Sequence, residues 1–279
     1  RPLTSGETLI LSDELNHNCI INGIRMAKPK SKDIYPHLDM GVLEEKLEDA
    51  VGNFSRVMII TDGVFSMRGD YVNLNDLVDL AKKYDSEFTE GVFTIMDDSH
   101  GVGSYGETGR GTTEVTGENG VDVLLATMGK SFGVNGGYVA TDRKVVEYLR
   151  ETSPFYIYSN PITAPEAYAA AKSVNIVDSE EGRRKLSHLR EMTKYFEDGL
   201  VDLGHEIIRG EHPIVPLMIR DTKKTTQLVD HLTENKILAT GIKYPVVPKG
   251  DESIRFQISA DHTKDDLDYV LEVIDNFSE

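Results

Sequence analysis

Three short segments carry the residue types that could do chemistry, and each follows a compact apolar run. They are residues 61–66 (TDGVFS), 97–101 (DDSHG) and 127–133 (TMGKSFG). A buried strand that delivers two aspartates to its end is costly unless a cation lies beside them. A pyridinium nitrogen is such a cation, and a lysine amine can form a Schiff base with a cofactor aldehyde. Asp97 and Lys130 therefore suggest a pyridoxal phosphate site.

Each segment also has a simpler interpretation. The aspartate pair could cap the next turn or bind a divalent metal, and Lys130 could be a solvated lysine in a turn. Strand ends usually meet polar loops, so one polar segment is weak support. Three such segments are stronger support, because the carboxyl ends of parallel strands converge on one crevice.

The first half of the chain alternates helical patterns with short apolar runs, which predicts an α/β fold with buried, largely parallel strands. We expect helices at 43–51 and 74–84, the second capped by Asn73, and strands at 56–61, 92–96, 121–126 and 136–141. The second half changes character, with a long helical stretch at 164–203 that is interrupted near 178–182. Strands at 214–219 and 253–259 and helices at 225–235 and 264–277 predict a smaller C-terminal α+β domain.

Composition narrows the function classes. The chain has 279 residues and a formal charge of −17, which argues against a nucleic-acid partner. No apolar run is long enough for a membrane span. The single cysteine, Cys19, excludes an intrachain disulfide and CxxC metal chemistry. We therefore expect a cytoplasmic protein with no metal site and no membrane partner.

Longer segments of the sequence resemble those of a known enzyme family. Residues 13–25, 61–74, 96–112, 127–140 and 244–262 match, in the same order, segments of the α-oxoamine synthases. These fold type I enzymes use pyridoxal phosphate to join an amino acid to an acyl-CoA. The resemblance implies a mainly parallel large domain (residues 1–171), a small C-terminal domain (172–279) and a homodimer with shared active sites. It also implies that an N-terminal portion of the large domain is missing.

The resemblance assigns a role to each matching position. Lys130 carries the cofactor and removes the Cα proton, Asp97 pairs with the pyridine nitrogen, and His17 stacks on the ring and takes part in catalysis. His100 and Ser66 lie near the phenolic oxygen. Thr127 binds the phosphate, Ser159 offers a phosphate contact from the neighbouring subunit, and Arg255 grips the amino-acid carboxylate.

The substrates are expected from the YPVVPKG segment (residues 244–250), which most resembles the glycine C-acetyltransferase branch, also called 2-amino-3-ketobutyrate CoA ligase. Glycine and acetyl-CoA are therefore the expected substrates. The alternative is the 8-amino-7-oxononanoate synthase branch, which uses alanine and a pimeloyl thioester. Serine palmitoyltransferase, a fold type I aldolase or aminotransferase, and an inactive truncated member that acts only as a binding subunit are further alternatives.

Overall fold

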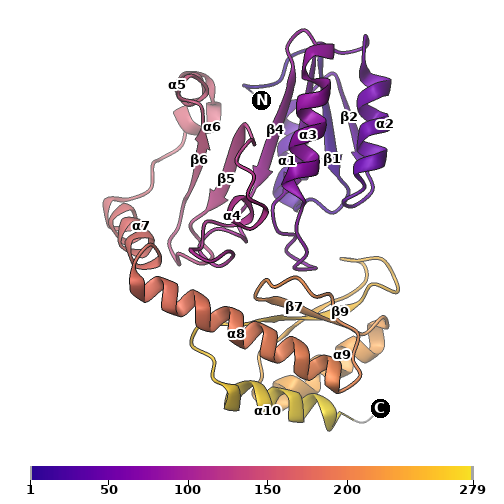
Figure 1. Cartoon of the computed structure of the whole chain (residues 1–279), viewed down its shortest axis with the longest axis vertical. Coiled ribbons are helices and arrows are strands. Elements are labelled where there is room, and N and C mark those ends of the chain that lie inside the picture. The colour runs from indigo at the N-terminus through magenta and orange to yellow at the C-terminus, as the bar shows by residue number, and fades with distance from the viewer. Residues whose placement is uncertain (1, 278–279) are drawn as a thin grey trace. The chain divides into compact units, whose positions relative to one another are not determined.

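The computed structural model describes residues 2–277, which divide into two compact units. The first comprises residues up to Phe65 and Tyr71–Asp178, and the second comprises Ser66–Asp70 and the residues from Ser179 onward. The division thus falls after Asp178, whereas the expected boundary after residue 171 would lie within a helix (Ala164–Val177). Figure 1 labels the elements of both units.

A six-stranded sheet organises the first unit, in the order β2-β1-β3-β4-β5-β6. The strands are β1 (Thr8–Asp13), β2 (Ser31–Tyr35), β3 (Arg56–Asp62), β4 (Val92–Asp97), β5 (Val123–Thr127) and β6 (Gly137–Thr141). Five of them are parallel, and β6 pairs with β5 in the antiparallel sense. The carboxyl ends of β1, β3, β4 and β5 therefore lie along one edge of the sheet.

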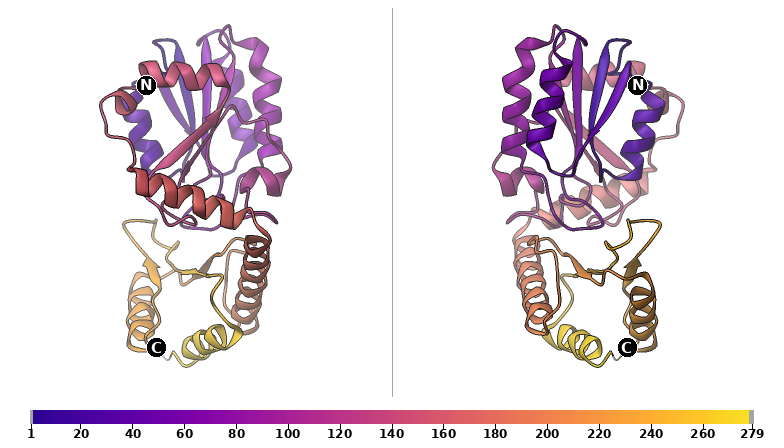
Figure 2. Two further views of the ribbon diagram at one scale, coloured as in Figure 1. Left: turned by 90° about the vertical axis from the view of Figure 1, so that its left-hand side faces the viewer. Right: turned by 90° about the vertical axis from the view of Figure 1, so that its right-hand side faces the viewer.

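Helices cover both faces of this sheet (Figure 2). The helices of this unit are α1 (Asn18–Ala27), α2 (Met40–Ala50), α3 (Leu74–Tyr84), α4 (Thr112–Thr116), α5 (Arg143–Thr152), α6 (Pro154–Ile157) and α7 (Ala164–Val177), with a 3-10 turn at Asp85–Glu87. Alternate strand residues face opposite sides. Leu9 and Leu11 pack with α2 and α3 in the main core, whereas Ile10 packs with Ile20 and Ile24 of α1. The two faces thus have separate apolar clusters.

The second unit is a small α+β domain around a three-stranded antiparallel sheet in the order β7-β9-β8. Its elements are α8 (Glu180–Asp202), β7 (Ile214–Met218), α9 (Thr222–Glu234), β8 (Thr240–Ile242), β9 (Ser253–Gln257) and α10 (Lys264–Asp275). Apolar residues of the three helices and of β7 and β9 form one core, in which Phe196 and Phe256 meet edge to face. Within residues 2–277, no helix has the length and apolar character needed to cross a membrane.

Candidate active site

The turn between β1 and α1 presents His17 at the carboxyl edge of the sheet. His17 is the N-cap of α1, and its Nδ1 accepts the Cys19 backbone N–H at 3.2 Å. The cap bond uses Nδ1, so Nε2 lies on the opposite side of the ring. The His17 ring is exposed to solvent, because capping α1 occupies only one edge of the ring. The cap therefore fixes the position of this imidazole at the start of α1.

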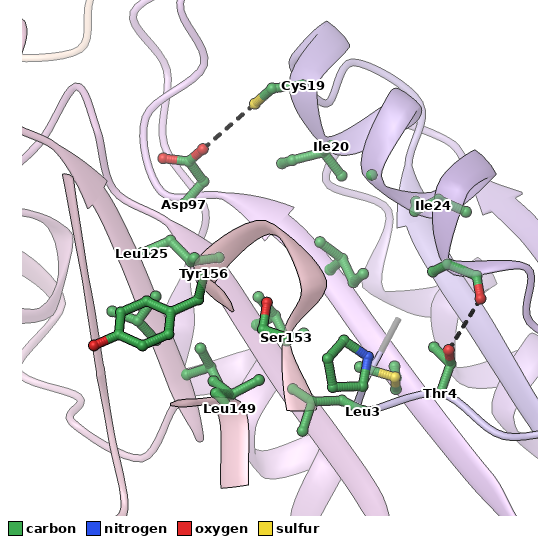
Figure 3. Close-up of a pocket in the computed structure, with 18 of the residues that line it drawn as sticks. Leu3, Thr4, Cys19, Ile20, Ile24, Asp97, Leu125, Leu149, Ser153 and Tyr156 are labelled. Carbon is green, nitrogen blue, oxygen red and sulfur yellow. Dashed lines mark hydrogen bonds between the residues drawn. The ribbon is translucent and has the colours of Figure 1, made fainter. Parts of the chain in front are cut away.

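Cys19 connects His17 to Asp97. Its Sγ lies 3.0 Å from His17 Nδ1 and donates to Asp97 Oδ2 at 3.7 Å. Figure 3 shows the thiol of α1 pointing at the carboxylate that ends β4. Burial, followed by the carboxylates of Asp97 and Asp62, raises the pKa of the thiol. Cys19 therefore stays a neutral thiol near neutral pH, and it is a weak donor that leaves Asp97 available for a stronger one.

The two aspartates of the DDSHG segment have different surroundings. Asp97 is half-buried, and its Oδ1 accepts the Ser99 N–H at 3.0 Å. Asp98 is completely buried and accepts both the backbone N–H and the hydroxyl of Thr112, at 2.9 and 2.6 Å. Burial raises the pKa of Asp98 to about 6 against the effect of these bonds. Asp98 therefore holds the following loop, while Asp97 Oδ2 accepts from the weakly donating Cys19 thiol.

Lys130 is presented by the loop between β5 and β6. The Thr127 N–H donates to the Ser99 hydroxyl at 2.9 Å, which ties the end of β5 to the loop after β4. The Thr127 hydroxyl donates to Gly136 O at 3.1 Å, and the Gly133 N–H donates to Lys130 O at 3.0 Å. Lys130 is exposed, and Asp62 lies within its electrostatic reach. The loop is thus a folded platform for the lysine.

His100 follows Asp97 in the loop after β4. It is half-buried, and its carbonyl accepts the Ser104 hydroxyl at 2.7 Å. The loop places it at the same edge of the sheet as Asp97 and Thr127. The structure therefore brings five of the expected residues together at the ends of neighbouring strands of the first unit, namely His17, Asp97, His100, Thr127 and Lys130.

Ser66 and Arg255 lie together in the second unit. Arg255, on β9, donates from Nη1 to Ser66 O at 2.8 Å. Among residues 2–277, its buried Nε has no hydrogen-bond partner. Burial lowers the pKa of the guanidinium. A buried donor without an acceptor is costly, and an incoming carboxylate would satisfy it.

An apolar pocket of about 720 Å³ adjoins Asp97 on the face of the sheet that α1 covers. Strand residues form its floor, and side chains of α1, α5 and α6 form its walls (Figure 3). Asp97 and Cys19 belong to its lining. Within residues 2–277, no group of three or more His, Cys, Asp or Glu side chains could hold a metal ion.

A family model described as aminotransferase class I and II matches residues 3–274. The chain belongs to this family. Its relatives include 8-amino-7-oxononanoate synthases from Thermosipho melanesiensis (41% identity, 97% of this chain and 67% of the relative) and Bacillus subtilis (38% identity, 98% and 67%). The chain thus spans about two thirds of the length of these relatives.

The chain also matches solved structures, and these matches show its fold. A Sphingomonas wittichii serine palmitoyltransferase matches with a TM-score of 0.90 at 24% identity, covering 98% of this chain and 67% of that one. An 8-amino-7-oxononanoate synthase from Francisella tularensis matches with a TM-score of 0.81 at 24% identity, covering 98% and 76%. The predicted α/β, fold type I architecture is confirmed, as are the predicted α-oxoamine synthase family and its pyridoxal-phosphate-dependent enzyme class.

The predicted substrates, glycine and acetyl-CoA, are wrong. Curated relatives at 37% to 42% identity are 8-amino-7-oxononanoate synthases, and their similarity extends over almost the whole chain. The glycine C-acetyltransferase prediction came from residues 244–250. Tyr244 and Val246 of that segment are exposed, in a loop between β8 and β9. Exposed loops vary readily among homologues, so this short match carried less information than chain-wide similarity.

Proposed function

We propose that the chain condenses alanine with a pimeloyl thioester to give 8-amino-7-oxononanoate, carbon dioxide and the free thiol. The observation that carries this proposal is the similarity to 8-amino-7-oxononanoate synthases over more than nine tenths of the chain. The strand-end site supplies the groups that the reaction needs.

The residues present fit pyridoxal phosphate. Asp97 Oδ2 accepts from the Cys19 thiol, which is a weak donor, and a pyridinium N–H would be a stronger one. Lys130 is exposed on a folded loop, and the Thr127 hydroxyl lies at the base of that loop. When bound, the cofactor supplies an aldehyde for amine attachment and an electron sink.

The chain's own residues then have separate tasks. Lys130 Nζ takes the Cα proton of the amino acid, and Asp97 keeps the ring nitrogen protonated. His17 would stack on the cofactor ring. Arg255 holds the amino-acid carboxylate, with Nε as an unused donor. His100 and Ser66 are assigned to the phenolic oxygen and Thr127 to the phosphate.

The substrate assignment is tested by measuring thiol release with added pyridoxal phosphate, using alanine or glycine against pimeloyl and acetyl thioesters. We expect kcat/KM for the alanine and pimeloyl pair to exceed that of the other pairs by at least about tenfold. Each methylene group of a long acyl chain that the pocket buries adds to the binding free energy. Mass spectrometry of the product checks the loss of carbon dioxide. Preference for another pair would contradict the proposal.

We also propose a homodimer, with Ser159 contributed to the partner's site. Ser159 donates to Phe155 O and follows a cluster of exposed apolar side chains, Phe155, Tyr156 and Tyr158. Their exposed fractions are 71%, 61% and 87%, which is unusual for three large side chains next to one another. Burial of this segment against a second copy would remove the exposed surface. The cytoplasmic setting stays a prediction.

Replacing Tyr158 by Glu tests the dimer. We expect the variant to sediment mainly as a monomer and to bind pyridoxal phosphate several-fold more weakly, because charge in an apolar interface is costly. Tyr269→Glu is a matched control, since Tyr269 is an exposed tyrosine on α10, in the other unit. A Tyr158→Glu protein that remains dimeric would contradict this assignment.

Cys19 reports directly on cofactor binding. It is the single cysteine of the chain, so iodoacetamide labelling is read without ambiguity by intact mass. We expect saturating pyridoxal phosphate to slow labelling at pH 8 by at least about tenfold, because a ring at Asp97 would cover the thiol. An unchanged labelling rate would place the cofactor elsewhere. Cys19→Ser is the control for labelling at other groups.

A further inference from the structure

Asp62 is the acidic residue at the end of β3, directly beside Asp97. The parallel register pairs Asp62 with Asp97, and the Gly63 N–H donates to Asp97 O at 2.8 Å. The Asp62 residue is 6% exposed. A carboxylate this well buried needs specific partners to stay charged. None of the roles described above uses it.

The partners of Asp62 belong to the turn that presents His17. Asp62 Oδ2 accepts the His17 backbone N–H at 2.7 Å. The Asp62 N–H donates in return to Asn16 Oδ1 at 2.8 Å. Asn16 Nδ2 donates to Ser12 Oγ at 2.9 Å and to Ile60 O at 2.8 Å. The turn between β1 and α1 is therefore fastened to the end of β3 through one carboxylate and one amide.

We propose that Asp62 is a positioning residue, which holds His17 over the cofactor position and whose negative charge strengthens cofactor binding at Lys130. The inference rests on the proposed function. The short bond to the His17 N–H fixes the backbone from which the imidazole projects. The ionised carboxylate makes that bond stronger than a neutral acceptor would.

The charged surroundings of Asp62 make its ionisation dependent on pH. Burial, together with the carboxylates of Asp97 and Asp13, raises its pKa to about 7, while the His17 N–H and Lys130 act in the opposite direction. The groups that face it are Asp13 of β1, His17 of the turn, Cys19 of α1, Asp97 of β4 and Lys130 of the loop after β5. Asp62 thus changes charge near neutral pH.

The burial of the ionised Asp62 carboxylate costs stability at neutral and alkaline pH. The folded-state pKa of about 7 exceeds the ordinary value of 3.8, so the folded protein binds the proton more tightly than the unfolded chain. The stabilisation of the fold by protonated Asp62 is fully present below about pH 4, and it is lost as the pH rises to about 7. A residue kept only for the fold would not be expected to carry this cost, whereas a functional residue can.

The Asp62→Asn variant removes the negative charge but keeps the shape of the side chain, because its amide oxygen can still accept the His17 N–H. In the cofactor-free protein we expect a higher melting temperature than wild type at pH 8 and an equal one at pH 4. We also expect Cys19 to alkylate faster at pH 8, since the Asp62 carboxylate raises the pKa of the thiol. Asp122→Asn is the matched control, as Asp122 also accepts a backbone N–H, from Thr94 at 2.7 Å, but precedes β5.

Cofactor titration then tests the role itself. We expect the wild-type protein to lose affinity for pyridoxal phosphate as pH falls through about 7, and Asp62→Asn to bind about tenfold more weakly at pH 8. The difference between the two proteins should vanish below about pH 6. Asp62→Ala, which also loses the acceptor for His17, should bind more weakly still. Asp122→Asn should follow the wild-type profile.

Two failures can be told apart. If the wild-type protein binds no pyridoxal phosphate at any pH, the proposed function fails and this inference fails with it. If the wild-type protein binds the cofactor and Asp62→Asn binds it with the same affinity and pH profile, this inference alone is overturned. Lower stability of Asp62→Asn at pH 8 would also overturn it, because Asp62 would then be a stabilising residue of the turn.

Discussion

Replacing Lys130 by Ala is expected to reduce kcat by at least about 10³-fold. The lysine is assigned both the attachment of the cofactor and the removal of the Cα proton, and a positioned general base alone contributes about 10²–10⁴-fold. The loop that carries Lys130 is held by backbone bonds and by the Thr127 hydroxyl, so the truncation should leave the fold intact. Thiol release with alanine and a pimeloyl thioester is the measurement.

The control for this experiment is Lys172→Ala. Lys172 is an exposed lysine on α7, in the same unit. It should keep wild-type activity and an unchanged melting temperature. A Lys130→Ala protein that retains more than about a tenth of the wild-type rate would show that another group removes the proton.

Replacing Arg255 by Lys is expected to raise KM for the amino acid by about 10- to 100-fold and to leave thioester KM nearly unchanged. A lysine has one charged nitrogen and cannot make the planar, two-point contact with a carboxylate that a guanidinium makes. It also cannot use Nε as a donor while another nitrogen contacts Ser66 O. Steady-state kinetics with each substrate varied in turn measures both effects.

Arg220→Lys is the matched control, because Arg220 is an arginine of the same unit whose guanidinium contacts the Glu206 carboxylate on the surface. It should change neither KM. Equal effects of Arg255→Lys on both KM values would point to a general disturbance of β9 and not to a carboxylate contact.

Strand prediction worked where apolar runs were compact. Residues 56–61 and 92–96 form β3 and β4, and Asn73 caps α3 as expected. The strand at Thr8–Asp13 was not predicted, although every residue in it is buried. The antiparallel direction of β6 was also not predicted, because side-chain periodicity is the same for both directions and only the long-range pairing with β5 decides it.

The site was partly predictable for a physical reason. Polar residues at the ends of adjacent parallel strands must lie close together, which placed Asp97 and Lys130 correctly relative to the sheet. The hydrogen bond from Arg255 to Ser66 joins residues far apart in the chain, and no local sequence pattern predicts it. Asp62 was visible as the aspartate at the end of a buried strand, but its bond to His17 depends on how β1 and β3 pair.

Peptide mapping after borohydride reduction tests the central claim most directly. The protein is mixed with pyridoxal phosphate, reduced, digested and analysed by mass spectrometry to find which amine carries the cofactor. We expect the modification on Lys130, abolished in Lys130→Ala and unchanged in Lys172→Ala. Modification spread over surface lysines, or concentrated on a different one, would contradict a cofactor site at the carboxyl ends of β3, β4 and β5.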